Sequence, residues 1–542
     1  MELDCLLLYI PKLKNYYKLF GNHMFGMFMP MGLFAIADLS ARSGFKTQIV
    51  HFGVEKIEDK NFCINDYVAK TKPKIIGLAL HWNFQSYDVI KIAQEIKSAN
   101  QNIFIVIGGF TATFFHDEIM EEFSFIDGVI KGDGETPFLK LTEAITDEAK
   151  DLSSVPNLSW RRGNKIIKNE ISYTASSKDL DELNFTNFSL LKNYELYIKY
   201  VKVPWFWISG LSKKFNLRLA DENLLGSFPL SISRGCYVNC SYCGGSRASQ
   251  KIMCNRQGVV FRSAEKVLES IEEAKNYGYY TIRIEYFPCE DAGYFEKLFN
   301  LIKAKALKLS CILECRALPA AHILELFRET FDLSQSQISF SPESGSEKIR
   351  KLNKGYYYDN SELLNAVNCS ISLGIKTAVF FALGLPFETT DTVRITKDFQ
   401  DHLRKEYNDL VIIRTEIIGL DPASPMYMEP EKYKIVKVWG SFMDYYDAHM
   451  GAKNFLKPIL GYYAEALCKK RVTVKKLTEA QFFENGIRKI YCKNFCRLNN
   501  FLSRKFKIKN MGLSTMMFSV LSNLFCGFAK QLLKCKDYIL KG

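Results

Sequence analysis

Three cysteines close together constrain this chain more than any other feature. Cys236, Cys240 and Cys243 follow the spacing C-x3-C-x2-C, directly after Arg234-Gly235. Three thiolates leave one position of a tetrahedral zinc site open, and they leave one iron of a four-iron cluster without a protein ligand. Such a centre can bind a further molecule at its open metal position. The alternative is a zinc or structural cluster with a fourth ligand from elsewhere, Cys254 being the nearest candidate.

Length and composition indicate a large globular protein from a reducing compartment. A chain of 542 residues is too long for one hydrophobic core, so two to four domains are expected. Hydrophobic residues make up 47% of the chain and charged residues 24%, as in ordinary globular proteins. The 15 cysteines show no paired framework, and no basic region precedes the short apolar run near the N-terminus. We therefore expect a cytoplasmic protein.

The first 150 residues alternate between short apolar runs and helical patterns, which predicts a doubly wound parallel sheet. The ligand of such a sheet lies at the carboxyl ends of the strands. Two glycine clusters fall there: Gly108-Gly109, and the turn Gly132-Asp133-Gly134-Glu135-Thr136-Pro137. Thr136 is expected to cap the next helix, with Pro137 at its first position. Strands are expected at 5–10, 47–51, 74–80, 103–107 and 126–130, and helices at 31–43, 86–99 and 137–146.

A second alternating pattern begins just before the cysteines. Residues 229–233 are typical of a strand that ends at Arg234, which places the cysteine loop where β/α barrels carry their chemistry. Ser263 is expected to cap the helix that follows. Further strands separated by helical patterns predict a partial, open (β/α)6 barrel. These strands are expected at 281–287, 309–315, 337–341, 376–383 and 410–418.

The cysteine spacing, with Tyr242 before the last cysteine, resembles the signature of the radical S-adenosylmethionine (SAM) enzymes. In that family the open iron of a [4Fe-4S] cluster binds SAM, and the reduced cluster cleaves it to a 5′-deoxyadenosyl radical. Glu343-Ser344-Gly345-Ser346 and Gly384-Leu385-Pro386-Phe387-Glu388 are similar to the family's SAM-binding motifs. Asp421-Pro422-Ala423-Ser424-Pro425 stands where the family has P-G-T-P. The resemblance implies that Cys236, Cys240 and Cys243 hold the cluster, and that Tyr242, Glu343, Ser344, Gly384 and Pro386 contact SAM.

The order of the motifs resembles the cobalamin-binding subclass of that family. It implies a Rossmann-like cobalamin-binding domain over residues 1–150, a bridging segment over 151–228, the radical SAM barrel over 229–434 and a basic, mainly helical region over 435–542. The D-x-H-x-x-G motif is absent, so no axial histidine from it is expected. His81 stands at a strand end beside the expected ligand edge. The implied cobalamin contacts are Gly108, Gly109, Gly132, Gly134, Glu135 and Thr136.

The C-terminal segment carries all of the excess positive charge. Residues 451–542 contain 19 Lys+Arg against 4 Asp+Glu, while the whole chain has a net charge of +13. Such a segment suits an anionic membrane surface, nucleic acid or an acidic partner, and equally a solvated helical face. The aromatic, helical pattern favours a cap over the barrel mouth, with an interfacial helix as the alternative. Only the basic tail favours nucleic acid, which we do not expect as a partner.

These patterns together predict a radical SAM enzyme that uses cobalamin to functionalise an unactivated carbon. C-methylation of a natural-product, lipid-like or peptide substrate is the expected reaction. Oxidation, cyclisation or rearrangement without methyl transfer is one alternative, and a catalytically silent Fe–S and cobalamin scaffold is another. The resemblance also implies an external electron donor such as a flavodoxin or ferredoxin. The expected location is the cytoplasm, with peripheral contact at the inner membrane face as a variant.

Overall fold

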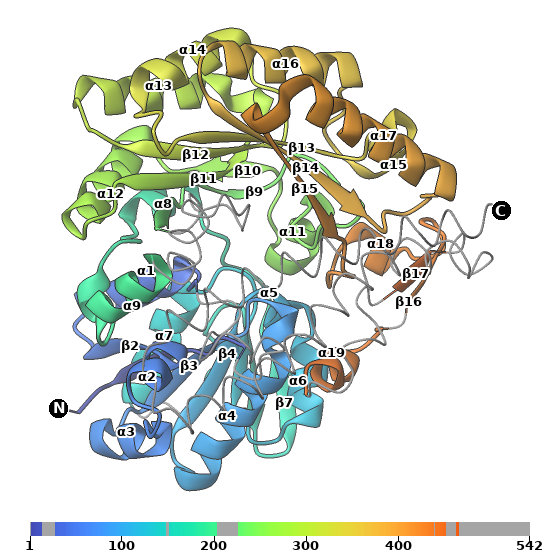
Figure 1. Cartoon of the computed structure of the whole chain (residues 1–542). Helices are drawn as coiled ribbons and strands as arrows, with labels where there is room; N and C mark the ends of the chain where they lie inside the picture. Colours follow the sequence, from blue (N-terminus) through green and yellow to red (C-terminus); the bar gives the residue numbers. More distant parts are fainter. Residues whose placement is uncertain are drawn as a thin grey trace, which may run out of the picture. The chain divides into compact units, whose positions relative to one another are not determined.

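The computed structural model describes residues 2–12, 28–147, 151–202, 226–437, 439–450 and 462–464. In this part of the chain two α/β modules follow one another, each with a parallel sheet and flanking helices (Figure 1). The predicted fold class, a Rossmann-like domain followed by a partial barrel, is confirmed. Most of the expected basic helical region, including all of 465–542, lies outside the described residues.

The first module is built on a seven-stranded sheet in the order β2-β1-β3-β4-β5-β6-β7. Strands β1 to β5 are parallel, and the order reverses beside β1, which is the switch point where doubly wound sheets bind ligands. Strands β6 and β7 are antiparallel and lie within the predicted bridging segment. The strands are β1 (Cys5–Tyr9), β2 (Thr47–His51), β3 (Ile75–Ala79), β4 (Phe104–Gly108), β5 (Gly128–Ile130), β6 (Leu158–Arg162) and β7 (Lys165–Lys168).

Helices cover both faces of this sheet, which explains its almost continuous apolar strands. All of β1 is buried, and its side chains alternate between two cores, with Leu7 in one and Leu6 in the other. Phe34 and Phe138 pack on the first face, and Val68 and Val89 on the second. The helices include α1 (Gly32–Arg42), α2 (Phe52–Glu58), α3 (Ile64–Thr71), α4 (Ser86–Ala99), α5 (Phe110–Phe114), α6 (His116–Glu122), α7 (Glu135–Thr146), α8 (Ser177–Glu182) and α9 (Tyr194–Lys202).

The predicted cap of α7 is wrong. The helix begins at Glu135, and its N-cap is Gly134, which has no side chain to accept a hydrogen bond. Because Gly134 already has a helical backbone conformation, with φ −104° and ψ −8°, Thr136 lies inside the first turn rather than before it. The helix therefore begins two residues earlier than the sequence indicated.

The second module contains the expected six-stranded parallel sheet, in the order β15-β14-β13-β12-β11-β8. Its first strand differs from the prediction, because β8 (Ser227–Pro229) ends before the cysteines. A separate strand, β9 (Ser233–Gly235), pairs antiparallel with β10 (Val259–Phe261) and leads into the cysteine loop. Leu230 and Ile232, which lie between β8 and β9, are both buried, so the sequence showed one continuous apolar run where the structure has two strands. The other strands are β11 (Thr281–Phe287), β12 (Ser310–Cys315), β13 (Gln337–Glu343), β14 (Lys376–Leu383) and β15 (Val411–Ile417).

The outer face of this second sheet packs against helices. It carries residues such as Ile284, Leu313 and Val379, which form a core with those helices. Ser263 caps α12 as predicted, its side chain accepting a hydrogen bond from the Lys266 amide. The helices are α11 (Arg247–Cys254), α12 (Ala264–Asn276), α13 (Ala292–Ala304), α14 (Ala321–Thr330), α15 (Glu347–Asn353), α16 (Asn360–Ser372), α17 (Thr390–Tyr407) and α18 (Pro425–Met428).

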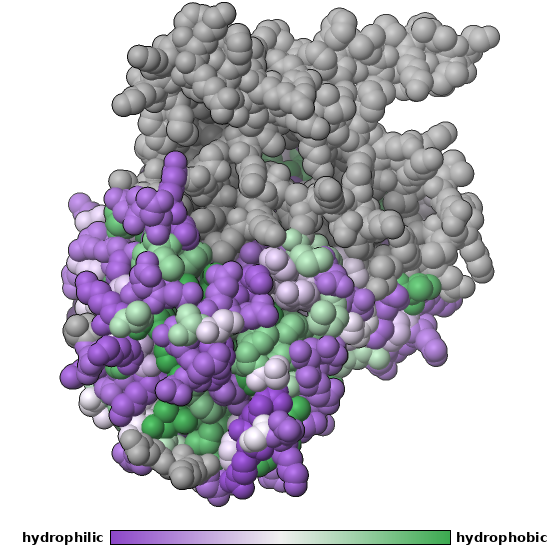
Figure 2. Space-filling model, turned by 90° about the horizontal axis from the view of Figure 1, so that it is seen from below, coloured by the Kyte–Doolittle hydropathy of each residue, from purple (hydrophilic) through white to green (hydrophobic). Residues whose placement is uncertain are grey.

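After the barrel the chain forms β16 (Ile435–Lys437), α19 (Phe442–His449) and β17 (Tyr462–Ala464). Strands β16 and β17 pair antiparallel, and α19 packs against α4 of the first module. Phe442 and Tyr445 are fully buried there. No helix in the described ranges is long and apolar enough to cross a membrane. Figure 2 shows one face of the molecule, on which hydrophilic residues predominate and apolar residues lie among them.

Candidate functional site

The three cysteines lie on one loop between β9 and α11. Two backbone amides donate to their sulfur atoms: Gly355 N lies 3.2 Å from Cys240 Sγ, and Gly245 N lies 3.4 Å from Cys243 Sγ. The Tyr286 hydroxyl lies 3.9 Å from the sulfur of Cys236. Amide donors directed at sulfur stabilise thiolate ligands and tune an iron–sulfur centre. The loop therefore fits the predicted [4Fe-4S] cluster in its donor set and in its surroundings.

The thiols of this loop are hard to ionise without a metal. Burial, together with Cys240, raises the pKa of Cys236 above its ordinary value. Burial likewise raises the pKa of Cys243 to about 12, with Asp421 and the neighbouring thiols adding to the shift. Because a thiol binds metal as the thiolate, cluster assembly must displace protons here.

The zinc alternative is not supported by the geometry. Within the described residues, no three Cys, His, Asp or Glu side chains are arranged to hold a single metal ion. Cys254 is buried at the end of α11, where the charged groups that influence it are those of Asp133 and Arg256 rather than the cysteine loop. In a four-iron cluster each cysteine binds a different iron, so three thiols need not converge on one point.

The cysteine loop is held from the segments that follow β13 and β15. Asp421 Oδ2 accepts a hydrogen bond from Gly244 N at 2.9 Å. Ser241 is bound to Asn353 through both its amide and its hydroxyl, the latter at 2.6 Å. Asp421 is exposed, although desolvation by the surrounding segments raises its pKa above the ordinary value and the Gly244 amide opposes this shift. Sequence reasoning placed Asp421 in a family motif but gave it no role.

Tyr242 and Glu343, both predicted to contact SAM, come together in the structure. Burial raises the pKa of Tyr242 well above its ordinary value, and the nearby Glu343 carboxylate adds to the shift. Glu343 ends β13, and one of its oxygens lies 3.7 Å from Nζ of buried Lys354. Ser344 is turned away into α17, where its hydroxyl bonds Thr396 at 2.9 Å. Ser344 thus supports the turn.

The predicted Gly384–Pro386 turn is closed by a carboxylate of its own motif. Glu388 Oε2 accepts hydrogen bonds from Gly384 N at 2.7 Å and from Leu385 N at 3.0 Å. Asn353 donates to Pro386 O at 2.9 Å, which links this turn to the cysteine loop. Leu385 packs with Tyr242 in a small core. The structure therefore brings Tyr242, Glu343 and this turn around the cysteines, and their contact with SAM stays a prediction.

At the carboxyl edge of the first sheet, position 109 requires glycine because the backbone of a neighbouring segment lies too close for a side chain. The φ of Gly109 is 114°, and an added Cβ would lie 2.8 Å from Leu80 O; at the preceding Gly108 a Cβ would meet nothing closer than 3.7 Å. The His81 ring packs between Trp82 and Phe110, each with a centroid distance of 4.9 Å. Burial lowers the pKa of His81 to about 4, so the imidazole is neutral.

This edge is connected to the cysteine loop. Asn83 Nδ2, just after His81 and Trp82, lies 3.5 Å from Asp421 Oδ1, and Asp421 in turn holds Gly244. The aromatic groups at the switch point and the neutral imidazole fit an extended organic ligand such as cobalamin. The cobalamin contacts of Gly108 and Gly109 stay predictions.

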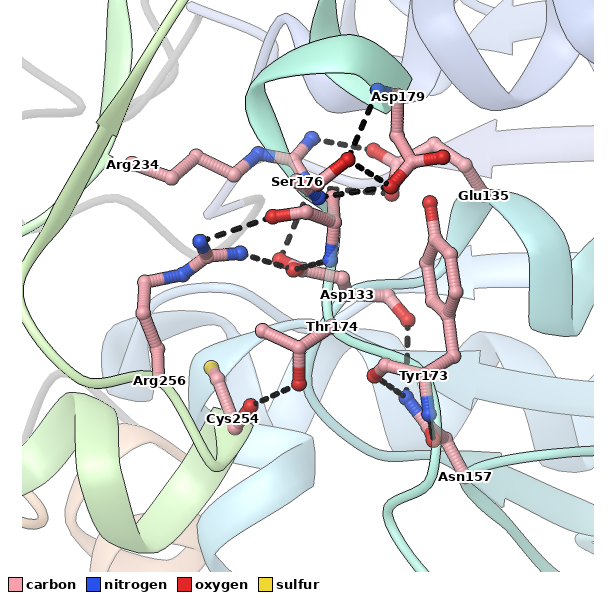
Figure 3. Close-up of polar contacts among 11 residues, drawn as sticks. Asp133, Glu135, Asn157, Tyr173, Thr174, Ser176, Asp179, Arg234, Cys254 and Arg256 are labelled. Carbon is pink, nitrogen blue, oxygen red and sulfur yellow. Dashed lines mark hydrogen bonds and ion pairs between the residues drawn. The ribbon is translucent and has the colours of Figure 1, made fainter.

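The second glycine turn lies against α11. Gly132 has φ 67°, and a Cβ there would lie 3.2 Å from Met253 O. The Glu135 carboxylate is paired with Arg234 (Figure 3). Cobalamin contacts at Gly132, Gly134, Glu135 and Thr136 stay predictions, and Glu135 is already engaged with protein. Asp133, Arg234 and Arg256 were missed as site residues, because a single sequence carries no signal that pairs distant charges.

The inner face of the barrel sheet carries several charged side chains. Arg283 on β11 pairs with Glu314 on β12, which also lies 3.0 Å from Arg316. Arg414 on β15 lies over the Phe380 ring, 5.8 Å from its centroid. Sequence reasoning assigned these residues to strands but did not single them out. Their alternation with the buried outer-face residues was the available signal.

Two family models match the chain. The model of the radical SAM superfamily matches residues 230–399, and the model of the B12 binding domain matches residues 17–142. An uncharacterized methyltransferase of Pyrococcus horikoshii, PH0819, is 24% identical over 71% of this chain and 75% of its own length. An anaerobic magnesium-protoporphyrin IX monomethyl ester cyclase of Rubrivivax gelatinosus is 23% identical over 61% of this chain and 55% of the cyclase.

Among solved structures, the fold is similar to that of TsrM from Kitasatospora setae, a radical SAM methyltransferase with cobalamin and a [4Fe-4S] cluster bound. The TM-score is 0.61 at 15% identity, over 86% of this chain and 85% of TsrM. The cobalamin-dependent radical SAM enzyme OxsB gives a TM-score of 0.55 at 14% identity, over 80% of this chain and 56% of OxsB. The predicted resemblance, with its [4Fe-4S] cluster, SAM and cobalamin, is thereby confirmed.

Proposed function

Because this chain belongs to the cobalamin-binding radical SAM enzymes, we propose that it transfers a methyl group to an unactivated carbon of its substrate. The cluster and SAM supply a radical that removes hydrogen from carbon, and cobalamin supplies the methyl group. One observation carries the proposal: Asn83 at the carboxyl edge of the first sheet reaches Asp421, which holds the cysteine loop through Gly244. A substrate bound beside this connection is accessible from both cofactor-binding modules.

The chain's own residues have defined tasks in this scheme. Cys236, Cys240 and Cys243 hold the cluster and leave one iron open to SAM. Glu343 offers a carboxylate that can accept hydrogen bonds from an ammonium or ribose hydroxyl group, and Lys354 balances its charge at 3.7 Å. The apolar contacts around Tyr242 would limit the access of water to the cysteine loop.

The barrel's inner face favours a polar substrate over a lipid. Glu314 is half-buried and already bound to Arg283 and Arg316, and Arg414 lies on the same face of the sheet. An acyl chain laid against these groups would remove them from water without replacing their hydrogen bonds. A small molecule or peptide with its own polar or charged groups would instead leave these groups hydrogen-bonded. We therefore propose a charged small molecule or peptide segment as substrate.

Radical cyclisation is the second candidate. It is favoured by the similarity to the Rubrivivax gelatinosus cyclase, which covers 61% of this chain. Both candidates require an electron for the cluster, and we propose a flavodoxin- or ferredoxin-like protein as its source. The predicted contact with a membrane surface concerns a segment that lies largely outside the described residues.

The deciding experiment is anaerobic reconstitution with iron, sulfide and cobalamin, followed by incubation with SAM and a strong reductant. Formation of both 5′-deoxyadenosine and S-adenosylhomocysteine, with cobalamin bound, supports methyl transfer. 5′-Deoxyadenosine without S-adenosylhomocysteine supports cyclisation or another radical reaction. Neither product, with cluster and cobalamin both bound and candidate charged substrates added, would favour the scaffold alternative.

A further inference from the structure

Four charged side chains, three of them buried and Arg234 partly buried, join the turn after β5 to both ends of the cysteine-loop segment. Arg234 immediately precedes the loop, and Arg256 follows α11. Arg234 Nη1 lies 2.9 Å from Asp133 Oδ1 and 3.0 Å from Glu135 Oε2, and its Nη2 pairs with Glu135 Oε1. Arg256 Nη2 pairs with Asp133 Oδ2. Asp133 therefore bridges the two arginines (Figure 3), which lie on either side of the three cysteines in the sequence.

The cluster is largely buried and balanced in charge. Glu135 is 2% exposed, Arg256 3% and Asp133 9%, while the Arg234 side chain is 21% exposed. Burial alone would lower the pKa of Arg234, but Glu135 and Asp133 outweigh it and raise the pKa above its ordinary value. Two positive and two negative groups cancel, so removing any one leaves a partner uncompensated in a medium of low dielectric. Such a cluster specifies one arrangement of the segments that carry it.

Hydrogen bonds to the backbone also join residues 174–175 to Asp133, Arg256 and the end of α11. Asp133 Oδ2 also accepts a hydrogen bond from Ala175 N at 2.9 Å, and Arg256 Nη1 donates to Ala175 O at 3.0 Å. Thr174 donates to Cys254 O at 2.7 Å. The two arginines are not independent, because Arg234 on β9 is paired with β10, which follows Arg256. The whole segment from Arg234 to Arg256 is thus anchored at both ends.

This arrangement gives Asp133 and Glu135 another role than cofactor binding. Both Glu135 oxygens and both Asp133 oxygens are engaged with guanidinium groups. A hydroxyl or amide of a ligand would have to compete with these charge-assisted bonds, which are about twice as strong as neutral ones. The carboxylates therefore point to the neighbouring module and not to a ligand.

We propose that Asp133 and Glu135 are positioning residues that fix the cysteine loop against the cobalamin-binding domain. They hold Arg234 and Arg256, and through them they set the separation of the iron–sulfur cluster from cobalamin. The proposal rests on the proposed function only in requiring both cofactors on one chain. It does not depend on which reaction the radical performs, and it replaces the sequence-based role of Glu135 as a cobalamin contact.

Pulsed electron paramagnetic resonance tests this in the full chain, without substrate or turnover. Protein reconstituted with iron, sulfide and cobalamin is reduced so that the cluster and cobalt(II) both carry an unpaired electron. A nearby reduced cluster accelerates the spin relaxation of cobalt(II). Glu135→Gln is expected to keep its iron and cobalamin contents and to lose part of this acceleration. Glu143→Gln, an exposed change on the same helix α7, is expected to match the unmodified protein.

Two results would overturn the proposal. If Glu135→Gln binds iron normally but loses cobalamin, while Asp133→Asn keeps it, Glu135 is a cobalamin contact. If both variants keep the full relaxation acceleration, the four charges do not set the separation. Should Glu135→Gln fail to fold, the double variant Glu135→Gln/Arg234→Gln removes the uncompensated charge. That variant is expected to regain both cofactors with a reduced acceleration, and unreduced acceleration in it would equally contradict the proposal.

Discussion

Individual residues of the cofactor motifs act mainly on the protein itself. Glu388 closes the turn that begins at Gly384, Asp421 holds Gly244, and Asn353 bonds both Ser241 and Pro386. Each is a polar side chain that satisfies backbone or side-chain groups; Asn353 and Glu388 are buried, and Asp421 is exposed. The motif therefore builds a rigid cradle, and its ligand contacts come from the backbone and the few groups that this cradle leaves available.

Glu388 makes stability depend on pH in an unusual direction. Burial raises its pKa from 4.5 to about 7. As the pH rises from about 4.5 to about 7, the unfolded chain loses this proton before the folded one, so stability falls, by at most about 3 kcal/mol. Glu388→Gln cannot ionise and should lack this loss. Urea unfolding of the metal-free protein at pH 5 and pH 8 measures it, and the exposed Glu325→Gln serves as control. Equal pH dependence of Glu388→Gln and the unmodified chain would contradict the assignment.

At the scale of elements, the cysteine loop is shaped by close backbone approaches. A Cβ on Gly244 would lie 2.4 Å from Pro422 O, whereas one on Gly245 would meet nothing closer than Cys243 Sγ at 3.7 Å. A side chain would therefore clash at Gly244 but fit at Gly245, and the sequence alone does not distinguish the two positions.

Gly244→Ala is expected to displace the loop and to lower the iron content after reconstitution. Overpacking of this kind costs about 1–3 kcal/mol, enough to shift a loop whose ligands must converge on one cluster. Gly245→Ala is the matched control and should retain most of its iron. The measurement is iron and sulfide per chain, together with the visible absorption of the cluster. Equal iron contents in the two variants would show that the loop accommodates the clash.

Helix α19 is fixed to the barrel by a buried hydroxyl. Tyr445 Oη donates to Leu420 O at 2.8 Å, just before Asp421, and Tyr445 is fully buried. Tyr445→Phe leaves this carbonyl without its donor and should lower the free energy of unfolding by about 1–3 kcal/mol. Tyr446→Phe, on the next residue of α19, is expected to cost less. Urea unfolding of both variants compares them, and a smaller loss in Tyr445→Phe would contradict the expectation.

Elements with a strong pattern were predictable, and local irregularities were not. The apolar run of β14 was expected at 376–383 and lies there, because a buried strand leaves a continuous signal. The break between β8 and β9 was missed, since Leu230 and Ile232 are buried on either side of it. The cysteine spacing marked the loop. The sequence did not predict that Asp133, Arg256 and Asp421 anchor this loop, because their partners are distant in sequence.

At the scale of the whole molecule, Gly132 marks where the first module meets α11. Gly132 and Gly163 both have positive φ, 67° and 57°, but only Gly132 has neighbours: a Cβ would lie 3.2 Å from Met253 O and 3.3 Å from Cys254 Cα. Comparing alanine at the two positions separates backbone strain from contact between modules.

Gly163→Ala should lower the free energy of unfolding by the strain alone, about 1–2 kcal/mol. Gly132→Ala should cost more, because α11 or the turn must also move by a few tenths of an ångström. We expect it to lower the iron content too, since α11 follows the cysteine loop. Chemical unfolding and iron analysis check this. Equal stability losses, with normal iron in both variants, would show that the modules do not press on Gly132.

The return of α19 to the first module has a consequence for the order in which the protein matures on the ribosome. Leu6, Leu8 and Val89 share one core with Phe442 and Tyr445. At about 5–20 residues per second, roughly 300 residues and some tens of seconds of synthesis separate the end of α7 from the emergence of α19. Until then the first domain exposes an unfinished apolar surface. The core of the first module is therefore completed only after the barrel has been synthesised.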